Sequence, residues 1–510
     1  MAARLALLLA CLSPLPAGAQ VTFADVTAGD LDVPVRSWGV SFADVDADGD
    51  PDLFVSRYSP PGGDALYRND GGAFTAVDAG PLTAGPGSIG HAWADADNDG
   101  DLDVLLVGAT GNARGFGDTG GGVRLLLNDG TGFAYRALDD LFSPAGGVEG
   151  WTGAWADVDG DGRLDVVVAH PAGFVSDPSQ PNALVRQVDA VDGRPRFTRV
   201  EGGPVTDGLD TYTVPTFSDY DRDGDPDLFI GSGPADGSLD VDHLYRNDGG
   251  TFVRITDGAP ATDARDGQVM NWQDVDNDGD LDLFVTSFRG GSPAAGLDDL
   301  YRNDGDGAFT PVTDDPLTTE STGFSLANTW GDVDLDVFVT TGGAGAIGQD
   351  RLYLNDGAGR FTRAWTTAPL PTAGAAFGDT DGDGALALVV VSQQGDPAGA
   401  AVHPVRLYEN RTDNGNAWVK VRLVGTASNA AGVGAMVSVT ATIGGRTVTQ
   451  LREVSTQNTF NGHNDLTVHV GLGDATSIGA VRVEWPSGQV DVGEDLGVDR
   501  TLTVTEGQGG

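Results

Sequence analysis

Residues 42–56 read FADVDADGDPDLFVS, and this stretch decides the fold. Two apolar runs flank a loop of the form D-x-D-x-D-G-x-x-D, which contains Asp44, Asp46, Asp48, Asp50 and Asp52. Carboxylates held this close together repel one another strongly unless a cation lies among them. Short apolar runs bounded by Gly, Asn and Asp indicate strands. The stretch therefore predicts a β-hairpin built around a metal ion.

The same loop recurs along the chain. It begins at Asp44, Asp95, Asp157, Asp219, Asp274, Asp332 and Asp379, and the successive gaps are 51, 62, 62, 55, 58 and 47 residues. Each unit also carries a phrase such as LYRNDG, and most have a strand that begins with Phe. Each unit thus reads as four short strands. Such units bury their faces against their neighbours, so the sequence predicts an all-β fold with a seven-bladed β-propeller.

The two ends of the repeat region complement each other. The seventh unit stops at LYEN, from Leu407, without its Phe strand, and an isolated Phe strand at Phe23 precedes the first unit. We expect residues 22–27 to complete the last blade and hide two sheet edges. The alternative is a linear array of seven modules, each of which would bury little apolar surface alone.

The spacing of the acids is typical of a calcium loop. Places one, three, five and nine supply carboxylates, Gly at place six permits the tight curl, and place seven offers its backbone carbonyl. Ca²⁺ accepts such oxygen-rich, flexible sites more readily than Mg²⁺ does. Five loops are complete, and the alternative for them is solvated acidic turns. The candidate ligands are Asp44, Asp46, Asp48, Asp50 and Asp52; Asp95, Asp97, Asp99, Asp101 and Asp103; Asp157, Asp159, Asp161, Arg163 and Asp165; Asp219, Asp221, Asp223, Asp225 and Asp227; Asp274, Asp276, Asp278, Asp280 and Asp282.

Two loops are damaged. The sixth keeps Asp332, Asp334 and Asp336 but lacks the residues that would close the loop, so we expect a tight turn without metal there. The seventh keeps three acids, but Ala387 replaces the acid at place nine. We expect a site at Asp379, Asp381 and Asp383 to be weak or empty.

These residues resemble the FG-GAP/VCBS repeat propellers, whose relatives include the integrin α-chain propellers, over about residues 21–410. The resemblance implies calcium in the acidic hairpins. The segments AWVKVRLVGTASNAAGVGAMVSVT, LREVSTQNTFNGHN, LTVHVGLG and VRVEWPSGQV resemble the ASPIC/UnbV domain of proteins similar to cartilage acidic protein, over about residues 416–506. After the pair Ser428-Asn429, members of that family usually have a basic residue, where this chain has Ala430. Alternating apolar residues there independently predict a small β-sandwich-like domain.

Composition and the N-terminus bound the remaining possibilities. The formal charge of −46 disfavours nucleic acid and anionic membranes as partners. Residues 1–19 read as a secretory signal cleaved after Ala19, with a lipoprotein signal lipidated at Cys11 as the alternative. No later stretch is apolar enough to span a membrane. We therefore expect a signal at 1–19, a propeller at 20–410, a β domain at 411–506 and a flexible tail at 507–510.

Catalytic motifs are weak in this sequence. GAGAIG, at 343–348, has no helix pattern after it, so a blade loop explains it better than a dinucleotide site. The histidines are scattered, and His463 and His469 are expected in ordinary strand or polar positions. Trp151 and Tyr212 are expected to pack between blades rather than stack on sugars.

The expected function is that of an exported, non-enzymatic, monomeric binding or adhesion module with about five Ca²⁺ ions. Its partner would be an extracellular protein or glycan, and its location secreted, periplasmic or at the cell surface. Variable segments at 56–65, 108–123, 169–183 and 231–243 are candidate docking sites. The alternative is a carbohydrate-active enzyme resembling a polysaccharide lyase, and a purely structural role at the cell surface is a third reading.

Overall fold

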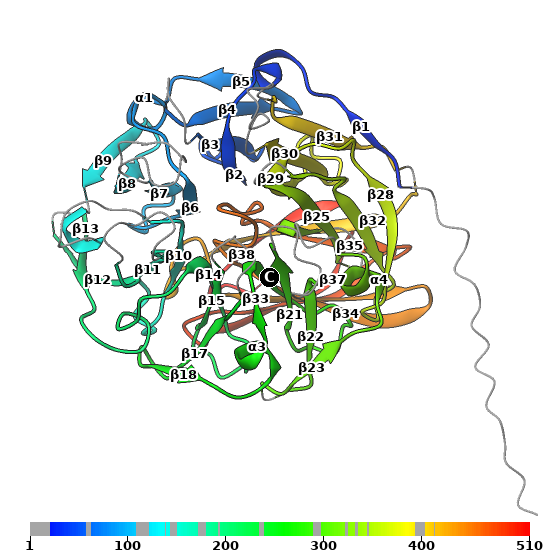
Figure 1. The fold of residues 1–510 in the computed structure, drawn as a ribbon. Helices are drawn as coiled ribbons and strands as arrows, with labels where there is room; N and C mark the ends of the chain where they lie inside the picture. Colours follow the sequence, from blue (N-terminus) through cyan, green and yellow to red (C-terminus); the bar gives the residue numbers. More distant parts are fainter. Residues whose placement is uncertain are drawn as a thin grey trace, which may run out of the picture.

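In the computed structural model, the chain forms a ring of small β-sheets with a second β domain against one face (Figure 1). The described residues are 21–57, 63–108, 122–137, 139–142, 150–171, 180–191, 194–233, 239–288, 297–305, 307–321, 325–331, 335–343, 346–392, 403–412 and 414–509. The expected signal segment lies outside them. None of the helices in these ranges is long or apolar enough to span a bilayer.

Among the described residues, seven antiparallel sheets lie around the ring, and each contains a run of four consecutively paired strands. In order they are β2 (Ser37–Ala43), β3 (Asp52–Arg57), β4 (Ala65–Asp70), β5 (Ala73–Val77); β6 (Gly90–Ala94), β7 (Asp103–Val107), β8 (Val123–Asn128), β9 (Phe133–Ala137); β10 (Gly153–Ala156), β11 (Asp165–Val168), β12 (Ala183–Val191), β13 (Arg194–Arg199); β14 (Tyr212–Ser218), β15 (Asp227–Ser232), β17 (His243–Asn247), β18 (Phe252–Ile255); β20 (Gly267–Gln273), β21 (Asp282–Ser287), β22 (Asp299–Asn303), β23 (Phe309–Val312); β24 (Ser325–Gly331), β25 (Asp336–Gly343), β27 (Arg351–Asn355), β28 (Phe361–Thr366); β29 (Thr372–Gly378), β30 (Ala387–Ser392), β31 (Arg406–Asn410) and β1 (Phe23–Asp25).

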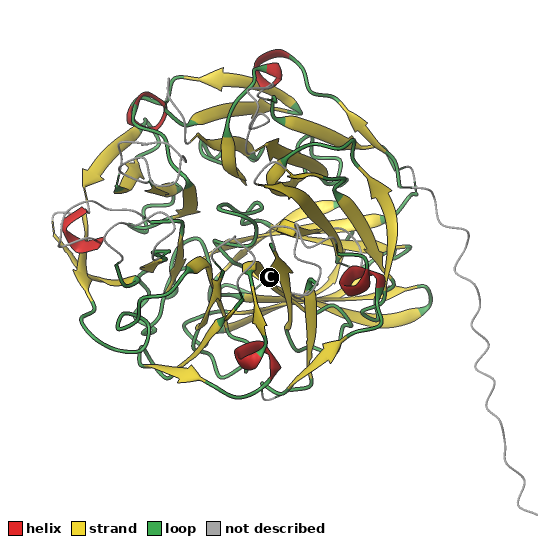
Figure 2. Ribbon diagram, in the orientation of Figure 1, coloured by secondary structure: helices red, strands yellow, loops and turns green. Residues whose placement is uncertain are grey.

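Smaller elements decorate the ring. Two-stranded pairings are made by β16 (Asp240–Val241) with β19 (Ala264–Arg265), and by β26 (Ala346–Ile347) with β25. One-turn helices connect successive sheets at the rim, as Figure 2 shows in red. They are η1 (Gly29–Asp32), α1 (Pro81–Ala84), α2 (Asp139–Phe142), α3 (Ala259–Thr262) and α4 (Pro316–Thr319).

The ring closes as the sequence predicts. β1 pairs with β31, with Phe23 opposite Asn410, so the N-terminal strand is the outer strand of the last sheet. The first strands contact one another in the order β2, β6, β10, β14, β20, β24 and β29, and β29 contacts β2. The fold is therefore a closed β-propeller. Trp151 and Tyr212 are buried in its core, as expected.

The C-terminal domain is a β-sandwich. One sheet has the order β35 (Val468–Gly473), β32 (Ala417–Val424), β38 (Arg500–Thr505), with β32 and β38 parallel; the other has the order β34 (Arg446–Glu453), β33 (Met436–Ile443), β36 (Ile478–Glu484), β37 (Val490–Leu496). Alternating apolar residues of both sheets form one core. In the segment predicted as a flexible tail, Gly507 and Gly509 donate backbone hydrogen bonds to Asp491.

The connection between β34 and β35, residues 454–467, crosses the centre of the ring, and we call it the plug loop (Figure 1). The plug loop contacts the first strand of every sheet. The contacts are Gly39 with Asn461, Trp93 N to His463 Nε2 (3.1 Å), Trp155 N to Thr456 Oγ1 (2.9 Å), Thr216 Oγ1 to Gln457 O (3.1 Å), Asn271 Nδ2 to Asn458 O (2.8 Å), Asn464 Nδ2 to Trp330 O (3.0 Å) and Thr459 Oγ1 to Ala375 O (2.6 Å).

The plug loop is held by apolar packing as well as by hydrogen bonds. Phe460 is fully buried, and its ring lies 5.5 Å from that of Trp38 and 5.9 Å from that of Trp151. Edge-on and tilted aromatic contacts of this kind add to the gain from burial. The C-terminal domain thus supplies part of the core of the propeller.

We expect Phe460→Ala to lower the free energy of unfolding by about 3–5 kcal/mol, because it opens a cavity among buried aromatic rings. Chemical denaturation followed by tryptophan fluorescence measures this loss. Val490→Ala, at a side chain that is 40% exposed, is the matched control and should change stability by less than about 0.5 kcal/mol. A loss below about 1 kcal/mol for Phe460→Ala would contradict a packed plug.

Four buried aspartates lie just before third strands, at the end of the sheets away from the acidic loops. Asp64, Asp242, Asp298 and Asp350 each accept a backbone N–H near the end of the second strand, at 2.7–2.9 Å. Asp350 also accepts the hydroxyls of Thr367 and Thr372. Burial raises the pKa of Asp350 to about 7. These carboxyls are not near the acidic loops and were not singled out in the sequence.

Asp350 gives a pH dependence with a definite sign. Its pKa in the unfolded chain is about 3.9, so the folded state holds the proton more tightly. Its contribution to stability is complete below pH 4 and is lost as pH rises toward 7. Asp350→Asn keeps an acceptor for Thr341 N–H but cannot ionise. We expect the melting temperature of the wild type to fall more between pH 5 and pH 8 than that of this variant. Equal falls would contradict the assignment.

Candidate metal centres

The five complete acidic loops each join the first strand of a sheet to the second. Their register is constant, since the acid at place nine always lies opposite the last residue of the first strand. The pairs are Ala43 with Asp52, Ala94 with Asp103, Ala156 with Asp165, Ser218 with Asp227 and Gln273 with Asp282. The loops therefore all lie on one face of the propeller.

The acid at place one folds each loop around itself. Asp44 accepts the backbone N–H of Asp48 at Oδ1 and that of Gly49 at Oδ2, both at 3.1 Å. The same two bonds recur at Asp95, Asp157, Asp219 and Asp274, at 2.8–3.2 Å. The acid at place five then accepts the N–H of place seven, at 3.0 Å in every complete loop. The loops are thus shaped by their own amides.

The acid at place nine is buried at the end of each loop, where the second strand begins. Asp52 accepts Val45 N–H at 3.2 Å and Asn69 N–H at 2.8 Å, and Asn69 is the Asn of LYRN. Asp103, Asp227 and Asp282 accept the backbone N–H of the corresponding Asn, and Asp165 accepts that of Gln187 instead. The backbone N–H makes this contact, while the Asn side chain donates to the acidic loop of the preceding sheet, as Asn69 Nδ2 does to Thr380 O (2.8 Å) and Asn247 Nδ2 to Val158 O (2.9 Å). Sequence reasoning did not find this role for the Asn of LYRN.

The acid at place three has a buried oxygen without a hydrogen-bond partner in every complete loop. That oxygen is Oδ1 of Asp46, Asp97, Asp159, Asp221 and Asp276, whereas Oδ2 of Asp46, Asp159 and Asp276 lies near an arginine. In each loop, one oxygen from each of three acids lies within 4.8 Å of the others, in the groups Asp44/Asp46/Asp48, Asp95/Asp97/Asp99, Asp157/Asp159/Asp161, Asp219/Asp221/Asp227 and Asp274/Asp276/Asp282. Each of these groups could hold a metal ion.

The electrostatics of the loops favour a cation. Burial raises the pKa of Asp52 to about 7, that of Asp103, Asp165 and Asp282 to about 8, and that of Asp227 to about 9; neighbouring carboxylates raise these values further. Each rise measures the cost of holding the carboxylate charged in an acidic, partly buried loop. A divalent ion would offset that cost. The oxygen-only donor set suits a hard cation.

Arginines on the third strands neutralise part of this negative charge. Arg186 lies 3.2 Å from Asp159 and Arg302 lies 2.9 Å from Asp276, and Arg68 contacts Asp46 in the same way. Arg68 and Arg302 are the Arg of LYRN. They contact the acid at place three, whose second oxygen stays free to face a metal in the loops of Asp159 and Asp276. Sequence reasoning did not assign them this role.

The two damaged loops differ from the rest. In the sixth, Asp332 and Asp334 lie outside the described residues, while Asp336 lies opposite Gly331 and accepts Asn355 N–H at 2.9 Å. Asp336 is therefore the equivalent of place nine, not place five as its spacing suggests. In the seventh, Ala387 lies opposite Gly378, which places an alanine at place nine, as predicted.

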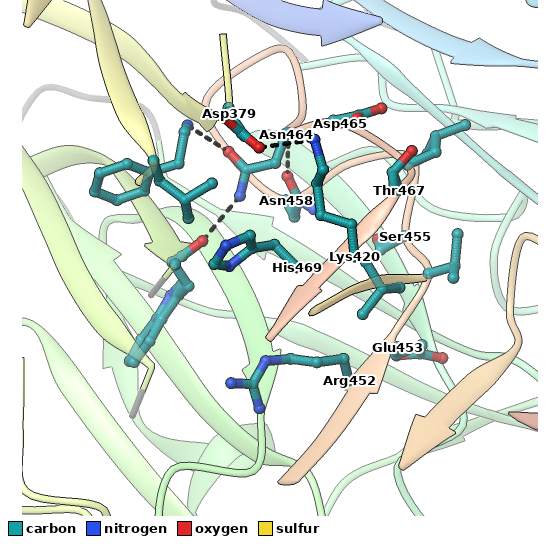
Figure 3. A pocket seen from close by; sticks show the side chains of 18 of the residues that line it. Asp379, Lys420, Arg452, Glu453, Ser455, Asn458, Asn464, Asp465, Thr467 and His469 are labelled. Atoms are coloured by element: carbon teal, nitrogen blue, oxygen red, sulfur yellow. Dashed lines mark hydrogen bonds and ion pairs between the residues drawn. The ribbon is translucent and has the colours of Figure 1, made fainter. Parts of the chain in front are cut away.

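A polar cavity lies between the seventh loop and the C-terminal domain (Figure 3). Its volume is about 90 Å³, and Asp379, Lys420, Arg452, Glu453 and His469 are among the side chains that line it. Two further cavities, of about 190 and 280 Å³, lie between the same domains beside Asp219 and Asp44. Burial raises the pKa of Glu453 to about 8 and lowers that of His469 to about 4. Sequence reasoning treated His469 as an ordinary position.

Other candidates are placed as follows. His463 is buried in the plug loop and accepts Trp93 N–H, which is a structural role. GAGAIG lies around the β25–β26 pairing, where residues 344 and 345 are not described. The four variable segments connect second and third strands. Their described ends lie at the end of the sheets opposite the acidic loops, and their central residues fall outside the described ranges.

Comparison with protein families finds two matches. The FG-GAP-like repeat model matches residues 44–106, 219–285, 274–336 and 328–390, and the ASPIC and UnbV model matches residues 425–510. No curated protein sequence matches the chain.

Solved structures resemble the chain only distantly. A Lactobacillus plantarum protein is 13% identical, with a TM-score of 0.37, and the match covers 65% of this chain and 85% of that one. An Aleuria aurantia lectin is 10% identical (TM-score 0.36; 65% and 96% covered), and the Vibrio cholerae biofilm matrix protein Bap1 is 14% identical (TM-score 0.34; 94% and 71% covered). Likeness at this level carries no argument about function.

Place four of each loop has a left-handed backbone, which yields a test of loop strain. Ala47 has φ +58° and Gly160, its equivalent in the third loop, has φ +70°. A side chain in this region costs about 1–2 kcal/mol, which glycine avoids at a smaller entropic cost. We expect Ala47→Gly to raise, and Gly160→Ala to lower, the free energy of unfolding by about 1 kcal/mol. Because a Cβ on Gly160 meets no atom within 4 Å, a clash cannot cause the loss; effects of the same sign would contradict this reading.

Proposed function

Because the chain belongs to the proteins that combine FG-GAP-like repeats with a C-terminal ASPIC and UnbV domain, we propose that it is an exported, calcium-stabilised, seven-bladed propeller that binds an extracellular protein or glycan without chemical turnover. The observation that carries the calcium assignment is the buried acid oxygen at place three, which lacks a hydrogen-bond partner in all five complete loops. The N-terminal pattern of residues 1–19 supports export.

The donor set of each loop fits Ca²⁺. Places one, three, five and nine bring carboxylates, and place seven offers a carbonyl, so the ion would have hard oxygen donors in a flexible loop. The ion would join the two strands of each hairpin on the face that meets the C-terminal domain. It would supply rigidity that disulfides cannot, since Cys11 is the only cysteine.

The arrangement of the domains favours binding on the opposite face. The plug loop fills the centre of the ring, and the C-terminal domain contacts acidic loops at Asn98, Arg222 and Asp379. Four cavities described between the domains, at about 90, 170, 190 and 280 Å³, are smaller than typical small-molecule sites, which have about 300–1,000 Å³. The face that carries the variable segments is the one left for a large partner.

The alternative function is carbohydrate cleavage, and these features weigh against it without testing it. A lyase needs a base beside a neutralised uronate, in a cleft that admits a polysaccharide. Incubation with a panel of acidic polysaccharides, followed at the absorbance of unsaturated products, distinguishes the two functions. We expect no new absorbance, and a calcium-dependent increase would replace binding with catalysis.

Calorimetric titration of chelator-treated protein tests the metal assignment. We expect about five Ca²⁺ ions per chain, with Kd on the order of 10⁻⁵ to 10⁻³ M, as in extracellular modules. Asp97→Asn should remove one ion, because it neutralises the acid at place three of the second loop. Asp101→Asn is the matched control in the same loop, since place seven contributes only its carbonyl, and it should leave the number unchanged.

Two results would contradict the metal assignment. One is heat release that does not saturate at any defined number of ions. The other is an equal effect of the two variants, which would mean that the acids act only as a diffuse negative surface. Screening immobilised glycans and extracellular proteins, with calcium and with chelator, then tests the binding role.

A further inference from the structure

The seventh acidic loop differs from the complete loops in the contacts of its acid at place one. Asp379, at place one, is only 5% exposed, yet it accepts no backbone N–H from its own loop. In the five complete loops, the equivalent acid accepts two N–H groups from its own loop. The seventh loop also has Ala387 at place nine. It has therefore lost a metal ligand and the two amide contacts at place one, although Asp383 at place five still accepts Ala385 N–H at 2.8 Å.

A cation nevertheless lies at this acid. Lys420 Nζ is 2.7 Å from Asp379 Oδ2, and the side chains are only 13% and 3% exposed. Figure 3 shows Lys420 extending from β32 of the C-terminal domain toward Asp379 of the propeller. Lys420 is the only lysine of the chain. We propose that the ammonium group of Lys420 takes the place of the metal ion in the seventh loop, so that this loop binds the C-terminal domain instead of calcium.

The surroundings hold the lysine in this position. The Trp418 ring lies 5.5 Å from Lys420 Nζ, in cation–π range, and the His469 ring stacks on Trp418. His469 Nε2 is 2.9 Å from the carbonyl of Gly384, at place six of the same loop. A Cβ on Gly384 would lie 2.0 Å from Trp418 Nε1. Strands β32 and β35 therefore fit closely against the seventh loop, and the ion pair lies within that contact.

This substitution occurs where the ring closes. The seventh sheet contains β1 from the N-terminus and is followed directly by the linker to the C-terminal domain. A permanent cation at this sheet makes ring closure and domain docking independent of the calcium concentration. The other loops would respond to calcium, whereas this one would not. The inference concerns a loop that the proposed function leaves without metal, so it can fail while the five calcium sites stand.

The test combines melting temperature with the number of bound ions. Lys420→Met should lower the melting temperature by about 5 °C, because it leaves a buried carboxylate unpaired, and the loss should be equal in calcium and in chelator. It should not change the number of bound Ca²⁺ ions. Lys420→Met combined with Ala387→Asp, which restores place nine, should bind one more ion than the wild type. Arg446→Met, at an exposed residue of the same domain, is the charge-matched control and should change neither quantity.

Several outcomes overturn the proposal. They are an unchanged melting temperature for Lys420→Met in chelator, a loss of one ion in Asp379→Asn, or an extra ion in Ala387→Asp with the lysine retained. If Lys420→Met does not fold, Asp379→Asn with Lys420→Met replaces it. That pair should be more stable than Lys420→Met alone, since it leaves no buried charge, and failure of the pair to fold as well would also overturn the proposal.

Discussion

The repulsion among clustered, partly buried carboxylates is the constraint on which this structure depends. Every complete loop places three acid oxygens within 4.8 Å of one another, and burial raises the pKa of the acid at its base. A charge of opposite sign removes that cost. We propose that calcium supplies it at five loops and Lys420 at the seventh. The arginines of the third strands supply part of it at three of the loops.

The two domains depend on each other physically. The β-sandwich covers the face on which the acidic loops lie, and its plug loop fills the channel that the first strands surround. The loops therefore act as both hairpin turns and the docking surface for a second domain. An ion bound in a loop would stabilise the strands below it and the contact above it, which couples metal binding to domain docking.

Much of the fold follows from local sequence. The spacing of the aspartates predicted the hairpins, and the orphan strand at Phe23 predicted ring closure, because both patterns lie within short segments. The plug loop could not be predicted in this way. Its residues Thr456 and Gln457 bond to Trp155 and Thr216, which lie more than 200 residues away. Lys420 is likewise an ordinary strand residue until the fold brings Asp379 beside it. The shift of Asp336 from place five to place nine needed the strand register.

Anomalous diffraction from crystals grown with calcium tests the central claim most directly. Cation neutralisation of the loops predicts ion peaks among the acids that follow β2, β6, β10, β14 and β20, and a lysine with no ion peak at Asp379. Water alone in the five complete loops, or an ion in the seventh, would contradict it.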